Sequence, residues 1–108
     1  MEVIHVHEHD GRKYLYFMCP GCKSLHCVVY PGWTWNEDLV HPTLSPSILT
    51  GRGKNPDGQP SFEVERCHSY IVNGQIQFLD DCYHELKNQT VPLPVMDDDA
   101  RHNRYKPA

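Results

Sequence analysis

The residues best suited to carry out chemistry are four cysteines in two pairs, Cys19 with Cys22 and Cys67 with Cys82. The first pair encloses Pro-Gly, a tight turn that points both sulfur atoms at a common centre and is typical of one half of a structural zinc site. The second pair flanks the Asn-Gly dipeptide at 73–74, which is the strongest short signal for a β-hairpin. The spacing therefore predicts a zinc site that joins two halves of the chain.

The hairpin explains why a thiol stands at each end of one sequence motif. With a two-residue loop at 73–74, Cys67 and Cys82 lie on one face as diagonal neighbours, with Cβ atoms about 7 Å apart. That separation is within reach of one tetrahedral zinc, whose bonds to sulfur are about 2.3 Å. The separation of the two pairs in the sequence is longer than in compact zinc ribbons, so a redox pair, a disulfide and unpaired buried cysteines stay open as alternatives.

Three histidines lie close in the sequence to these cysteines: His26, His68 and His84. His84 falls on the Cys82 side and can replace a cysteine as ligand, and His26 is a further candidate. His68 alternates away from Cys67, so it points to the opposite face of the hairpin. With Asp81 and Glu85 nearby it can join a hydrolytic site in which a carboxylate is the base and an open metal the Lewis acid. The alternative is that these histidines only support the metal ligands through hydrogen bonds.

A second group of residues suits the binding of a partner. Trp33 and Trp35 alternate with a threonine, so both indoles share one side if the segment is a strand; they suit a partner surface, or core packing for at least one. Thr43 and Ser45 lie in HPTLSPS, a loop restricted by two prolines, and are further contact candidates. A serine nucleophile is disfavoured in this loop, because it lacks a Gly-x-Ser-x-Gly elbow and no base is identified.

The elements that must position these residues are mostly strands. Asp-Gly at 10–11 predicts a hairpin over 3–18, and a second hairpin is expected over 62–82, with a loop at 51–61 before it. One or two helical turns are expected over 81–88. The fold class predicted is β-rich and zinc-ribbon-like, with two hairpins joined through the CPGC knuckle. A single domain over residues 1–94 and a flexible polar tail over 95–108 complete the expectation.

Composition narrows the function classes. The 108 residues carry a formal net charge of −4, and Lys and Arg form no cluster, which disfavours nucleic acid as the partner. No run of eighteen apolar residues and no signal peptide is visible, so the expected location is the cytoplasm. In that compartment cysteines are reduced or bound to metal.

Five motifs together resemble a known family: FMCPGCKSLHCV, GWTWN, HPTLSPSIL, CHSYIVNGQIQFLDDCYHEL and QTVPLP. The family consists of small phage- and prophage-encoded proteins of unknown function that often carry the label ammonia monooxygenase, and the resemblance covers residues 17–94. It implies a phage origin and a metal site at the four cysteines, with His26, His68 and His84 as positions of the family motifs. Ammonia oxidation does not fit, because that reaction belongs to a much larger membrane assembly. Relatives also occur beside genes for bacterial ubiquitin-like conjugation.

These observations predict a phage-encoded zinc-binding module that acts on a host protein or nucleoprotein in the bacterial cytoplasm. The alternative is a small zinc-dependent hydrolase with a histidine-lined site, in which the metal keeps an open position.

Overall fold

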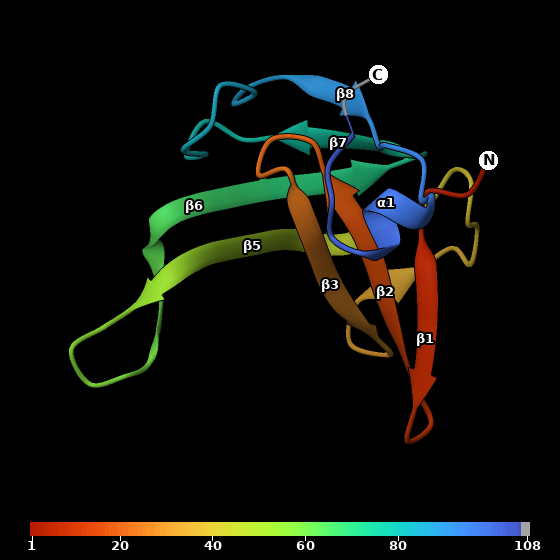
Figure 1. Ribbon diagram of the computed structural model, residues 1–108, viewed down its shortest axis with the longest axis horizontal. Helices are drawn as coiled ribbons and strands as arrows, with labels where there is room; N and C mark the ends of the chain where they lie inside the picture. Colours follow the sequence, from red (N-terminus) through yellow and green to blue (C-terminus); the bar gives the residue numbers. More distant parts are fainter. Residues whose placement is uncertain (107–108) are drawn as a thin grey trace.

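The computed structural model describes residues 1–106 as two antiparallel sheets and one short helix (Figure 1). The first sheet has the order β1-β2-β3, and its strands are β1 (His5–His9), β2 (Arg12–Cys19) and β3 (Ser24–Tyr30). The second sheet has the order β4-β5-β6-β7-β8, and its strands are β4 (Thr34–Trp35), β5 (Leu44–Lys54), β6 (Pro60–Val72), β7 (Gln75–Phe78) and β8 (Thr90–Pro92). The helix α1 spans Asp98–Arg101. The predicted fold class, β-rich and zinc-ribbon-like, is confirmed.

Both predicted hairpins form around their predicted turns, but the second strand of the second hairpin ends at Phe78, so Cys82 follows the hairpin in place of lying on it. In the first, Val6 pairs with Leu15 across a turn at 10–11 whose two residues have φ values of 51° and 75°. In the second, Ser69 pairs with Phe78 across a turn at 73–74 with φ values of 50° and 79°. Positive φ at both central residues is what a type I′ turn requires, and Asn-Gly and Asp-Gly supply it at low energetic cost.

The core lies between the two sheets, whose strands cross at a steep angle (Figure 1). Alternation along each strand sends every second side chain inward, so Leu15 and Phe17 of β2 meet Ile71, Ile76 and Phe78 of the second sheet. These five side chains are at most 1% exposed. Burial of an aliphatic or aromatic side chain stabilises a fold by about 1.5–3 kcal/mol, so this contact holds the sheets together.

The strands β5 and β6 extend beyond the first sheet as a two-stranded arm (Figure 1). The loop expected over 51–61 is therefore shorter, because strand pairing continues to Lys54 and resumes at Pro60. The register of β5 against β6 shifts between Leu44 and Ile48 and twice more further along the arm. Such irregularities change the direction in which side chains point. Ser47 lies within the first of them, between Leu44 and Ile48.

The C-terminal part differs from the expectation. Residues 81–88 form turns in place of a helix, with i to i+3 bonds such as that from the Lys87 N–H to the His84 carbonyl (3.2 Å). The short helix is α1, inside the segment expected to be a flexible tail. Asp97 caps it, accepting a hydrogen bond from the Ala100 N–H, and Met96 is buried. Residues 107–108 of the expected tail lie outside the described residues. No helix in the described part of the chain has the length and apolar character to cross a membrane.

Candidate metal centre and candidate active site

The CPGC turn at the end of β2 forms a knuckle around sulfur. The Lys23 N–H donates to the Cys19 carbonyl at 2.8 Å, and the Cys22 N–H donates to the Cys19 sulfur at 3.3 Å. These bonds fold the turn so that both sulfur atoms face the same side. Glycine is needed at position 21, because a Cβ there would overlap the imidazole ring of His84.

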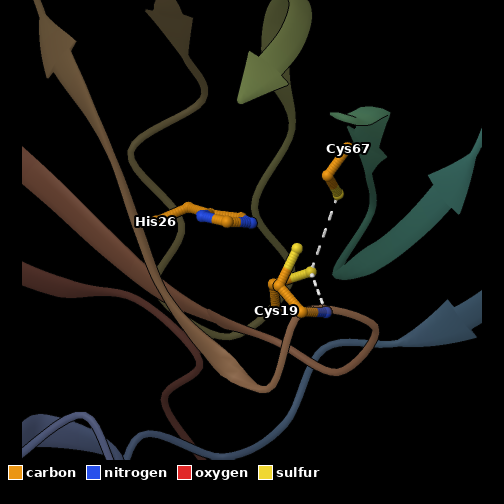
Figure 2. Close-up of side chains that lie close together, drawn as sticks. Cys19, His26 and Cys67 are labelled. Atoms are coloured by element: carbon orange, nitrogen blue, oxygen red, sulfur yellow. Dashed lines mark hydrogen bonds between the residues drawn. The ribbon is translucent and has the colours of Figure 1, made fainter. Parts of the chain in front are cut away.

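The knuckle meets β3 and β6 at a cluster of potential ligands (Figure 2). Its four members are Cys19, Cys22, His26 and Cys67, and their ligand atoms all lie within 4.8 Å of one another. The Cys19 and Cys67 sulfurs are 3.9 Å apart, too far for a disulfide at about 2.05 Å and close to the roughly 3.8 Å that tetrahedral zinc requires. The cluster joins the two sheets, since Cys19 ends β2 and Cys67 lies on β6.

Hydrogen bonds among the three thiols of the cluster shift their pKa values in opposite directions. Hydrogen bonds from the thiols of Cys19 and Cys67 lower the pKa of Cys22. The bond to Cys22 raises the pKa of Cys19 to about 12, and bonds to Cys19 and Cys22 also raise that of Cys67. The Nε2 atom of His26 is buried with no hydrogen-bond partner in the described part of the chain. A buried polar atom without a partner is unfavourable, and a metal ion would satisfy it.

Cys82, predicted as the fourth ligand, lies beside this cluster in a second group with Cys67 and His84, again within 4.8 Å. The Nε2 atom of His84 is 3.5 Å from the Cys67 sulfur, and burial lowers the pKa of this imidazole. The Cys82 thiol donates to the His68 carbonyl at 3.1 Å, and its sulfur accepts from the His68 N–H at 3.3 Å. The Cys82 sulfur therefore forms hydrogen bonds with both the backbone N–H and the carbonyl of His68 on β6.

On the opposite face of β6, His68 connects two polar side chains from other elements. The Ser47 hydroxyl of β5 lies 3.0 Å from Nε2, and a carboxylate oxygen of Asp81, in the turn after β7, lies 3.2 Å from Nδ1. An ionised carboxylate can only accept, so the Nδ1–H donates to Asp81 and leaves Nε2 free to accept from the hydroxyl. This order of serine, histidine and aspartate is the arrangement of a catalytic triad.

The carboxylate of this arrangement also has a cationic neighbour. An Arg66 guanidinium nitrogen lies 3.5 Å from Asp81, and the same guanidinium donates to Glu63 at 2.7 Å and to the Phe62 carbonyl at 2.9 Å. Partial desolvation raises the pKa of Asp81, but the bonds from His68, from its own N–H and from Arg66 together lower it. Asp81 is therefore held as a carboxylate facing His68.

The predicted partner-binding residues lie around the start of β5 and take part in local structure. Both indoles are partly buried against the core; that of Trp33 donates to the Pro46 carbonyl at 3.0 Å, and that of Trp35 packs edge-on against Tyr30. The Thr43 hydroxyl accepts from the Asn73 N–H at 2.9 Å, and the Ser45 carbonyl accepts from the Thr34 hydroxyl at 3.3 Å.

Sequence reasoning missed Ser47 as a candidate. A serine nucleophile in HPTLSPS was disfavoured because the sequence identifies no base. In the structure His68 lies beside Ser47 and can act as that base. Two features of the sequence pointed toward this pair: the hydroxyl-rich HPTLSPS segment, and the alternation that turns His68 away from the metal side of its strand.

A comparison with protein families gives a match over residues 1–79 to the family described as bacterial ubiquitination-like system serine protease (BubE). The chain belongs to the BubE family. The matched segment includes Ser47 and His68, as well as the four-residue Cys/His cluster, whereas Asp81 follows it. No curated protein and no solved structure matches this BubE family member.

Proposed function

We propose that this chain is a serine protease that acts on a protein of a bacterial ubiquitination-like system, with Ser47 as the nucleophile. The observation that carries the proposal is the hydrogen-bonded series from Ser47 through His68 to Asp81, at 3.0 and 3.2 Å. The description of the BubE family, with its serine protease, supports it independently.

In the reaction, the Ser47 Oγ attacks the carbonyl carbon of the scissile peptide bond while its proton passes to the His68 Nε2. The same imidazolium then gives this proton to the leaving amine, which departs as the C–N bond breaks and leaves an acyl ester on Ser47. A water molecule next attacks the ester carbonyl carbon and loses a proton to His68. The bond between the acyl group and the Ser47 Oγ then breaks, His68 returns the proton to this oxygen, and the carboxylic acid product is released. Asp81 keeps Nδ1 protonated and stabilises the imidazolium in both steps.

We infer that the metal is zinc and that Cys19, Cys22, His26 and Cys67 hold it. Sulfur and imidazole ligands suit zinc, and four protein ligands leave no open position, which is the mark of a structural site. When bound, the ion supplies folding energy. A thiolate at Cys67 would then fix the segment of β6 that carries His68, since the two residues are consecutive.

The same geometry disfavours a zinc-dependent hydrolase that uses His26, His68 and His84 around one open metal. His68 faces away from Cys67 and is engaged by Ser47 and Asp81 instead. The phage origin, the host protein as partner and the cytoplasmic location stay predictions.

The test is labelling with a fluorophosphonate, which reacts with activated serines, read by intact mass and peptide mapping. We expect one adduct on Ser47. Ser47→Ala should abolish it, whereas Ser45→Ala, which changes an exposed serine of the same strand, should keep it; both variants should retain the wild-type circular dichroism spectrum. Absence of an adduct on the folded, metal-loaded wild type would refute the proposal.

A further inference from the structure

We propose that the substrate binds as an extended segment along the edge of β5, pairing with the peptide groups of Leu49 and placing an apolar side chain on Leu49 and Tyr70. This inference rests on the proposed protease function and names the substrate form that the site accepts.

The backbone argument starts from His68, which pairs with Leu49 in the β5–β6 ladder. The His68 carbonyl accepts from the Leu79 N–H at 3.0 Å, and both peptide groups of His68 contact the Cys82 sulfur, so they point away from β5. The pair of Leu49 and His68 is therefore a non-hydrogen-bonded pair. In such a pair the N–H and C=O of Leu49 point away from β6, toward the opposite edge of β5.

Within the described residues, no strand pairs with that edge beside the nucleophile. The neighbouring strand β4 pairs only with Leu44 and Ser45, and within the described residues its pairing stops before Ser47. A residue whose N–H and C=O are both free can donate a hydrogen bond to one residue of an added strand and accept one from it, which is the principle of β-strand addition. A substrate bound there would pass Ser47, two residues before Leu49 on the same strand.

Two large apolar side chains on the face of the triad are exposed. Leu49 lies opposite His68, and Tyr70 follows His68 by two residues, so both share the face of the triad. Leu49 is 38% exposed and Tyr70 42% exposed. Single exposed apolar residues are common, but two that flank a nucleophile offer a surface for one apolar side chain of the substrate. Because this surface is open, we expect it to select apolar side chains of the substrate in general more than a side chain of one particular shape.

The test uses an internally quenched peptide library, randomised at one position at a time, with fluorophosphonate labelling of Ser47 measured in parallel. We expect the wild type to prefer apolar residues at one position. Leu49→Asn and Tyr70→Asn should each lower kcat/KM for those peptides about tenfold or more while the rate of labelling stays within about twofold. Val72→Asn, at a 55% exposed position further along the same face, is the matched control and should change neither quantity.

A second measurement tests the backbone pairing on a cleaved peptide. Methylation of the one amide nitrogen that donates to the Leu49 carbonyl should lower kcat/KM about tenfold or more, whereas methylation of its two neighbours should not. Equal effects at all three amides or an unchanged preference in both variants would each overturn this inference and leave the proposed protease intact. Labelling of Ser47 without cleavage of any peptide would overturn this inference and the proteolytic activity, and would leave only an activated serine. Failure of labelling would overturn both.

Discussion

Replacing Cys82 separates its two possible roles, metal ligand and support for His68. In Cys82→Ala, the His68 N–H loses its acceptor, and an unpaired buried N–H costs about 1–3 kcal/mol. The His68 carbonyl keeps the Leu79 N–H, so it adds little. Loss of the buried sulfur adds about 1 kcal/mol, comparable to one methylene group. We therefore expect the free energy of unfolding to fall by about 2–4 kcal/mol, or on the order of 10–20 °C in Tm.

Metal content and reactivity complete this experiment. Cys82→Ala should still bind one zinc per chain by elemental analysis and native mass spectrometry, whereas Cys67→Ala should lose it. The rate of fluorophosphonate labelling should fall tenfold or more, because a displaced base no longer meets the Ser47 hydroxyl. Cys82→Ser is the matched variant, since its hydroxyl restores a donor and an acceptor and should recover part of the stability. Loss of zinc from Cys82→Ala equal to that from Cys67→Ala would refute this reasoning and make Cys82 a ligand.

Three further substitutions test other parts of the site. Asp81→Asn should lower kcat by about 10⁴-fold while folding is retained, since the imidazole loses the partner that fixes its tautomer; peptide kinetics would show it. Folding lowers the pKa of Asp81 from its ordinary value of 3.8, so the carboxylate contributes its full stability above pH 3.8 and loses it as the pH falls through the pKa of the folded state. The free energy of unfolding of Asp81→Asn should therefore depend less on pH below 3.8, as measured by chemical denaturation. Gly21→Ala should destabilise by about 1–3 kcal/mol and loosen zinc, because the His84 ring is packed on Phe78 and cannot yield; an unchanged Tm would contradict this. Ser69→Ala should raise stability by about 1 kcal/mol, because its buried hydroxyl has no hydrogen-bond partner in the described part of the chain; chemical denaturation would show it.

Local signals in the sequence were enough to predict the hairpins and three of the four members of the cluster, namely Cys19, Cys22 and Cys67. Asn-Gly at 73–74 fixes its own turn and hence the register, and Pro-Gly between Cys19 and Cys22 fixes the knuckle. Such features depend on residues that are neighbours in the chain, so composition and spacing reveal them.

The remaining features depend on distant contacts. The register of β5 against β6 shifts between Leu44 and Ile48, and this shift decides which hydroxyl of the loop reaches His68. Nothing in the residues themselves predicts that shift. His26 became a member of the cluster because the first sheet crosses the second near Cys67, an arrangement set by core packing across both sheets. The C-terminal segment likewise orders because Met96 and Ala100 pack against Met18.

Consecutive residues of β6 belong to two different centres, because Cys67 faces inward to the thiol cluster and His68 faces outward to the nucleophile. One peptide bond therefore links the state of the metal to the alignment of the base. A newly made chain that has not yet acquired its ion would leave Cys67 untethered, and its base would lack a fixed position beside Ser47. Uptake of the ion and onset of the proposed proteolysis would then be a single event.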